Sequence, residues 1–184
     1  MKDSKKQKTI VHTKKMVTAA LFAAISFGMT MISVPLPVVG YGNLGDCFVL
    51  LSGWLLGPLW GAVAAGLGTA LADLALGYGL YAPATFFIKA LMAVAAYFVG
   101  SMLMGSSVHM GRRILAHTSA AVCGEIIMIG GYFVYESILY GAVSAVASLP
   151  GNGVQAVAGA VLSTALITLI RGNKVLNGIF TKEK

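Results

Sequence analysis

Long apolar stretches, separated by short polar or glycine-containing segments, dominate the order of residues along the chain. A helix that crosses a membrane needs about 20 mostly apolar residues. Such stretches occupy residues 16–34 and 84–104, and two more fit within residues 114–170. Residues 44–77 hold about one and a half such lengths, and a Gly-Pro pair at 57–58 lies in their middle. Because proline lacks a backbone donor and disfavours an uninterrupted helix, this segment predicts two short helices or one kinked helix.

The basic residues decide between these alternatives, because cytoplasmic loops carry the excess of lysine and arginine. Two helices in residues 44–77 give six spans. A chain that starts inside then places its lysine-rich start, Arg112 with Arg113, and the basic residues after 170 on the cytoplasmic side. A single helix would put the last two groups outside. We therefore predict an all-α integral membrane bundle of six helices with cytoplasmic N- and C-termini. The second span, with about 14 residues, is short for a ~30 Å membrane core.

One domain fits the chain, residues 16–171, between a basic cytoplasmic tail at 1–15 and a second cytoplasmic tail at 172–184. The lysines of the first tail also suit a signal peptide, but Pro35 follows the apolar stretch where a small-residue cleavage site would be needed. We expect a retained first helix. Residues 132–149 stay apolar beyond the expected exit of the fifth span, which fits a long tilted helix or an additional external turn equally well. Asn152 and Gln155 are expected to begin the sixth span.

Composition agrees with a membrane location. The chain is 58% hydrophobic and 10% charged, with a mean hydropathy of +0.85, whereas soluble domains carry about 25% charged residues. Its net charge of +7 lies in the tails and one loop, and not on the polar, aromatic-rich face that nucleic-acid binding needs. Cys47 and Cys123 lie in apolar stretches and are interpreted as packing residues. No hydrolase, metallopeptidase or phosphate-loop motif occurs, so we predict no catalytic residue, metal site or cofactor.

Ionisable and polar side chains of the predicted spans gather in the middle and the outer half of the membrane. Charged groups there are costly and commonly mark a binding site or a pathway. Counting 1.5 Å per helical residue places Asp73 and Lys89 in the outer half and Glu125 near the middle. With tyrosines that offer a ring face and a hydroxyl, these groups predict a polar pocket open to the exterior. The residues assigned to it are Asp46, Asp73, Tyr78, Tyr81, Lys89, Glu125, Tyr132, Glu136, Asn152 and Gln155.

A structural role is the alternative for several of these residues. Asp46, Asp73 and Glu136 lie near predicted helix ends, where a carboxylate can be exposed or cap the helix. Lys89 can instead pair with Glu125 or Asp73 and hold the bundle together, because a lone buried charge tends to be neutralised unless it has a partner.

Small residues in the first span form two stripes with four-residue spacing, Ala19 with Ala23 and Ala20 with Ala24. Lipid provides no hydrophobic drive for helices to associate, so small residues mark faces where helices approach closely. The stripes predict contact either with another helix of the same chain or with a partner protein.

Five segments resemble a known family: GNLGD at 42–46, LLGP at 55–58, ALADL at 70–74, YAP at 81–83 and IKALM at 88–92. Over nearly its whole length the chain is similar to the substrate-binding S components of energy-coupling factor (ECF) vitamin transporters. Within them it looks closest to the branch assigned to hydroxymethylpyrimidine or vitamin B6 compounds.

The resemblance implies a multi-pass protein of a prokaryotic cell membrane that binds a vitamin with high affinity on its outer side. It implies as partners a transmembrane coupling subunit and two cytoplasmic ATPase subunits, so ATP and Mg²⁺ belong to those subunits and this chain is not an enzyme. The loop at 34–45 corresponds to the family's gating loop, whose proline and glycine content suits a hinged lid. By position, this loop and the later spans supply ligand contacts, which adds Asn43 to the pocket. The family's Ala-x-x-x-Ala stripe, carried over to Ala19, Ala20, Ala23 and Ala24, implies a surface for the coupling subunit.

The substrate that fits best is a small aromatic heterocycle with hydroxyl groups, hydroxymethylpyrimidine first and a pyridoxine-type compound next. The alternative is a stand-alone secondary transporter or channel for a small solute, which would need polar groups through the inner half of the membrane as well. An intramembrane enzyme and a purely structural bundle are the further alternatives.

Overall fold

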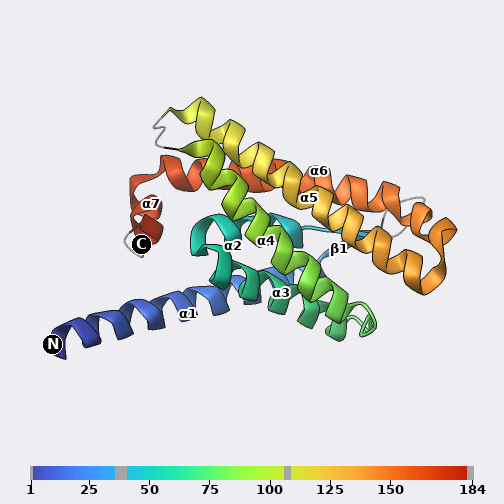
Figure 1. Ribbon diagram of the computed structural model, residues 1–184, viewed down its shortest axis with the longest axis horizontal. Coiled ribbons are helices and arrows are strands. Elements are labelled where there is room, and N and C mark those ends of the chain that lie inside the picture. The colour runs from blue at the N-terminus through green and yellow to red at the C-terminus, as the bar shows by residue number, and fades with distance from the viewer. Residues whose placement is uncertain (1, 36–40, 106–108, 182–184) are drawn as a thin grey trace.

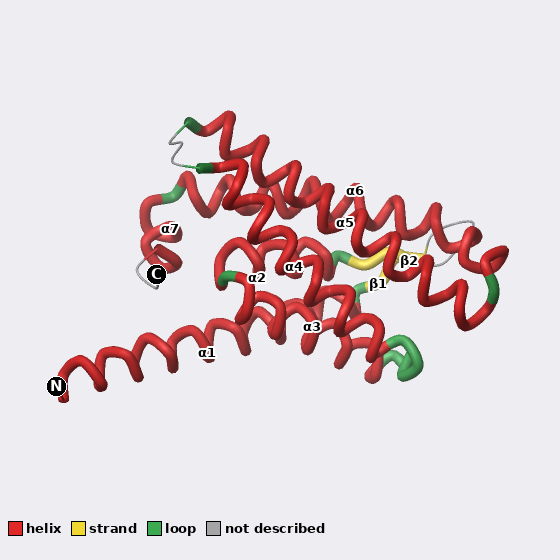
Figure 2. Tube along the Cα trace, in the orientation of Figure 1, coloured by secondary structure: helices red, strands yellow, loops and turns green. Residues whose placement is uncertain are grey.

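The structure is a computed structural model that describes residues 2–35, 41–105 and 109–181. It is almost entirely helical, with one short hairpin of two strands near the middle of the bundle (Figures 1 and 2). In chain order the elements are α1 (Lys2–Met31), β1 (Ser33–Pro35), β2 (Tyr41–Asn43), α2 (Gly45–Leu56), α3 (Pro58–Ala75), α4 (Ala82–Met104), α5 (Met110–Tyr140), α6 (Ala142–Gly172) and α7 (Lys174–Thr181).

The helices α1 to α6 form one bundle with two distinct ends (Figure 1). The start of α1, the end of α4, the start of α5, and α7 lie on the left of the view; this is the α7 end. The turns from α3 to α4 and from α5 to α6 lie on the right, on the side where β1 and β2 extend; this is the hairpin end. Within the described residues, α3, α4, α5 and α6 are each long and apolar enough to cross a membrane, and α2 is a shorter apolar helix.

The chain reverses direction at Gly57, between α2 and α3. Gly57 has a φ of +86°, in the left-handed region that favours glycine. Pro58 is the first residue of α3, where a missing backbone N–H breaks no hydrogen bond within the helix. The two-helix interpretation of residues 44–77 is therefore confirmed. At 12 residues, α2 is even shorter than predicted.

α2 lies in the centre of the bundle, in contact with α1, α3, α4 and α6. Ten of its 12 residues are buried. Gly53 permits the closest approach, since a β-carbon there would lie 3.0 Å from the carbonyl carbon of Ala93 in α4. The half of α2 toward α7 joins Ala96, Ala120 and Ile167 in an apolar core. An apolar cluster therefore lies between the hairpin end and the α7 end.

Two boundaries differ from the sequence prediction, and one alternative is resolved. The first span was expected at 16–34, but α1 ends at Met31 and Ser33 starts the hairpin, because the residues that follow pair as strands. For the fifth span, the long-helix alternative holds and not the separate external turn, since α5 is one continuous helix to Tyr140. The sixth span was expected to begin near Asn152, which is wrong. α6 starts at Ala142 and holds Pro150 inside it, as neighbouring helices in a membrane bundle permit.

Candidate substrate-binding site

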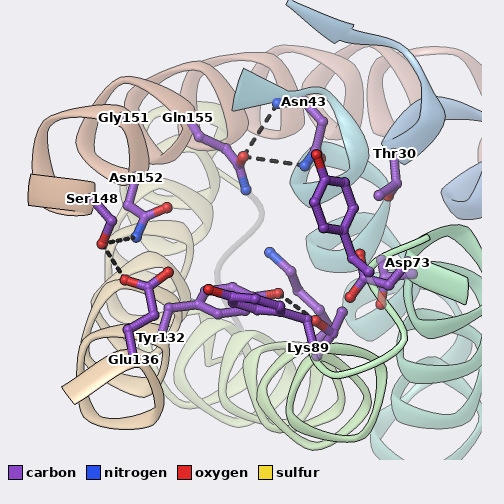
Figure 3. Close-up of a pocket in the computed structure, with 14 residues that line it drawn as sticks. Thr30, Asn43, Asp73, Lys89, Tyr132, Glu136, Ser148, Gly151, Asn152 and Gln155 are labelled. Atoms are coloured by element: carbon purple, nitrogen blue, oxygen red, sulfur yellow. Dashed lines mark hydrogen bonds between the residues drawn. The ribbon is translucent and has the colours of Figure 1, made fainter. Parts of the chain in front are cut away.

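A cavity of about 200 Å³ lies at the hairpin end of the bundle. Its walls come from α1, β2, α3, the α3–α4 turn, α4, α5 and α6, and most of the side chains point into the same space (Figure 3). The lining residues are Thr30, Asn43, Thr69, Asp73, Tyr78, Tyr81, Thr85, Lys89, Tyr132, Glu136, Ser148, Gly151, Asn152 and Gln155.

Nine of the eleven residues that the sequence assigned to a pocket line this cavity, and Asp46 and Glu125 do not. Five lining residues were missed. Four of them precede a predicted residue by four positions on the same helix: Thr69 before Asp73, Thr85 before Lys89, Ser148 before Asn152, and Gly151 before Gln155. Residues four apart share a helix face, so this spacing could have identified the three hydroxyl groups. Thr30 gives no comparable signal.

A buried ion pair between Lys89 of α4 and Asp46 of α2 forms the floor of the cavity. Lys89 is 3% exposed and Asp46 is fully buried. The sequence left Glu125 or Asp73 as the partner of Lys89, and both assignments are wrong. It also placed Asp46 at an outer helix end, where exposure was one interpretation. The physical reason for the difference is that α2 begins inside the bundle, beneath the hairpin, so that its first turn faces α4.

Gln155 connects this floor to the hairpin. Its Nε2 donates a hydrogen bond of 2.6 Å to Oδ2 of Asp46. Its Oε1 accepts hydrogen bonds from both the backbone N and the Nδ2 of Asn43, each at 3.2 Å. The Oδ1 of Asn43 in turn accepts from the backbone N of Gly45 at 2.9 Å, at the start of α2. A continuous polar chain therefore runs from Asn43 through Gln155 and Asp46 to Lys89; Figure 3 shows its upper part.

Glu125 lies beneath the floor and not on the cavity wall. It is 3% exposed, and neither carboxylate oxygen has a hydrogen-bond partner among the described residues. It faces α6 at Gly159, where a β-carbon would overlap its carboxylate and lie 3.0 Å from Cβ of Asp46. The glycine therefore provides the space that the Glu125 side chain occupies.

Aromatic side chains form one wall and the rim. The Tyr132 hydroxyl and the Thr85 hydroxyl are 2.9 Å apart and share a hydrogen bond. The Nζ of Lys89 lies 5.4 Å from the centroid of the Tyr132 ring, within the range of a cation–π interaction. Tyr81 packs edge-on against Tyr78, with ring centroids 6.5 Å apart, and against Tyr135 at 5.6 Å. Such rings offer apolar faces together with hydroxyl groups to a flat ligand.

Carboxylates lie on two opposite sides of the cavity in Figure 3. On one side, Glu136 accepts a hydrogen bond from the Ser148 hydroxyl, and Asn152 donates to the same hydroxyl at 3.4 Å. On the other side, Asp73 is 7% exposed, and its Oδ2 is buried without a hydrogen-bond partner among the described residues.

The two alanine stripes of α1 lie in different environments. Ala19 is 4% exposed and belongs to the apolar core, against which Ala23 packs. Ala23 also approaches α3 closely, since a β-carbon at Gly68 would lie 3.1 Å from its carbonyl carbon. Ala20 and Ala24 are exposed. The first stripe therefore makes contacts within the chain, and the second forms part of the surface.

Comparisons with known proteins agree with this architecture. The family described as "ECF-type riboflavin transporter, S component" matches residues 10–172. An uncharacterized protein of Pyrococcus woesei is 36% identical over 144 residues, which cover 78% of this chain and 91% of that protein. The thiamine precursor transporter HmpT of Lactococcus lactis subsp. cremoris is 27% identical over 179 residues, which cover 91% and 93%.

A solved structure, described as the S component of a bacterial ECF transporter, superposes with a TM-score of 0.64. It shares 19% sequence identity, and the match covers 88% of this chain and 97% of that one. The two proteins therefore share a fold.

Proposed function

The chain belongs to the family of ECF-type riboflavin transporter S components, membrane proteins that bind a transported substrate, and on this premise we propose that it captures a small single-ring vitamin or vitamin precursor. Hydroxymethylpyrimidine is the first candidate and a pyridoxine-type compound the second. The substrate enters from outside the cell and is delivered through a separate ATP-driven coupling module.

The cavity at the hairpin end is the observation that carries this proposal. Its volume of about 200 Å³ is below the ~300–1,000 Å³ typical of sites for drug-sized ligands. A single substituted ring fits such a space better than the three fused rings of a flavin. Tyrosine rings, hydroxyls and charged groups on the walls suit a flat heterocycle with polar substituents. Similarity to a relative named as a thiamine precursor transporter supports the same class of substrate.

The hairpin supports a lid function. Through Asn43 it is bonded to Gln155 on α6 and to the first turn of α2, and both Asn43 and Gln155 line the cavity. Opening the hairpin would break the two bonds from Asn43 to Gln155 and expose the space below. Residues 36–40, part of the loop predicted as a lid, lie outside the described residues.

The partner surface follows from the exposed stripe of α1. Ala20 and Ala24 lie near Val17 and Leu21, which are 61% and 57% exposed. Small residues flanked by larger apolar ones let a second helix approach closely, and we assign this face to the coupling subunit. The apolar core between the cavity and the α7 end fits this proposal, because a substrate in the cavity would have to pass these described apolar side chains to cross the chain.

Equilibrium binding to the purified chain tests the proposal. Isothermal titration in detergent would use hydroxymethylpyrimidine, pyridoxine, thiamine and riboflavin as ligands. We expect saturable binding with one site and the highest affinity for a single-ring compound. Riboflavin as the tightest ligand would contradict the assigned substrate class. The absence of saturable binding for all four compounds would contradict the function.

A further inference from the structure

Asp73 carries an unused hydrogen-bond acceptor at the cavity wall. It lies in the last turn of α3, is 7% exposed, and lines the cavity. Its Oδ2 is buried and accepts no hydrogen bond from the described residues. Native proteins leave few buried polar atoms unsatisfied, and such an atom in a cavity wall suggests a group that arrives with a ligand.

Two polar groups of the same cavity have other partners. The Nζ of Lys89 is bonded to Asp46, and the Thr85 hydroxyl shares a hydrogen bond with Tyr132. The Thr69 hydroxyl donates to the backbone O of Ala65 on its own helix, at 2.8 Å. The floor and the wall beneath Asp73 are thus internally paired, whereas its Oδ2 is not.

Two further features separate Asp73 from the other carboxylate of the cavity. Glu136 already accepts a hydrogen bond from Ser148 on the opposite side. Thr30 lies on the same side as Asp73 in Figure 3, and its buried hydroxyl also lacks a partner among the described residues. Together, Asp73 and Thr30 form an edge of the cavity that can exchange hydrogen bonds with a ligand.

An ionised carboxylate only accepts hydrogen bonds, so the ligand group that meets Asp73 must be a donor. We propose that Asp73 is a specificity-determining residue that binds an amino group or another N–H donor on the edge of the substrate ring. This inference rests on the proposed function and narrows its substrate class to nitrogen heterocycles with an amino or N–H edge. A ring with a methyl group at that position has the same shape but leaves the carboxylate unpaired.

A pair of ligands tests this inference on the unmodified chain. Titrations would compare 4-amino-5-hydroxymethyl-2-methylpyrimidine with the analogue that carries a methyl group in place of the 4-amino group. Loss of a hydrogen bond to a charged acceptor predicts about 10- to 100-fold weaker binding of the methyl analogue. Equal affinity for the two would overturn the inference while leaving the proposed function intact. Failure of both, and of every other single-ring compound, would overturn the two together.

Matched substitutions assign the effect to one carboxylate. In Asp73→Asn, we expect the affinity ratio of the two ligands to fall by about 5-fold or more, since a neutral acceptor forms the weaker bond. Glu136→Gln removes the same charge from the opposite wall and is expected to keep the ratio within about twofold, whatever it does to each affinity. An equal fall in both variants would show a general effect of charge and overturn the assignment to Asp73. If Asp73→Asn does not fold, the ligand pair on the unmodified chain decides alone.

Discussion

Replacing Lys89 with methionine should destabilise the empty protein strongly. Methionine keeps the length and much of the apolar volume of the lysine side chain, so the change removes mainly the charge and its donors. Asp46 then remains fully buried beneath the cavity, and among the described residues Gln155 is left to donate a hydrogen bond to it. Breaking a buried ion pair from one side costs about 3–5 kcal/mol, because the other charge is left uncompensated.

The pair itself is expected to add much less to stability than this loss suggests. Two charges that leave water carry a desolvation cost that offsets most of their mutual attraction. The double variant Asp46→Asn with Lys89→Met should therefore recover a large part of the lost free energy of unfolding. The amide introduced by Asp46→Asn can still accept from Gln155 in that background, so that bond does not confuse the comparison.

Unfolding in detergent by heat or by titrated sodium dodecyl sulfate measures these differences. Trp54, which is 5% exposed and donates to the backbone O of Ala96 at 3.0 Å, is a fluorescent reporter inside the core. Lys14→Met is the matched control, since Lys14 is exposed on α1 and should shift stability by less than about 0.5 kcal/mol. A Lys89→Met variant within about 1 kcal/mol of the original protein would refute the view that the ion pair is sealed from water. A double variant as unstable as the sum of the single ones would refute the compensation.

Three further predictions concern the packing, the lid and the partner surface. Gly53→Ala should destabilise the protein by about 1–3 kcal/mol, because the added methyl group meets the backbone of α4. Gly130→Ala is the control in the same unfolding assay: no atom lies within 4 Å of a β-carbon at this position, so the change should be neutral or slightly stabilising. Gln155→Leu removes the bonds that tie the hairpin to α6 and should raise the ligand dissociation rate about tenfold or more in stopped-flow measurements; an unchanged rate would show that the hairpin is held by other contacts. Ala24→Trp should abolish uptake into cells that express the coupling module but keep ligand binding. Val122→Trp, on the exposed face of α5, is the control and should keep both uptake and binding. Equal loss of binding and uptake in Ala24→Trp would contradict the assigned surface.

The apolar stretches and the basic residues were enough to predict the main helices and the break at Gly57. Helix positions and the break could be predicted because both depend on local sequence: the length of an apolar stretch, and a proline beside a glycine. The hairpin was not predicted. Its strands are only three residues long, and the proline and glycine content of the loop was interpreted only as suiting a hinged lid.

The candidate site was predicted as a set of residues but not as a set of contacts. Depth along each helix was sufficient to place Lys89, Tyr132 and Gln155 in one layer of the bundle. The partner of Lys89 depends instead on how far each helix is rotated about its axis, and Asp46 lies 43 positions away in the chain. Glu125 faces Gly159 and not the cavity, because depth along a helix carries no information about the direction of a side chain.

The central position of α2 has a consequence for how this protein can vary. A typical membrane helix exposes one stripe of its surface to lipid, and apolar substitutions along that stripe are well tolerated. With ten of its 12 residues buried, α2 has almost no such stripe. Saturation mutagenesis should therefore find intolerance at consecutive positions from Val49 to Leu55 without a helical period, while α4, with Phe87, Leu91 and Phe98 exposed, should show a periodic alternation of tolerant and intolerant sites.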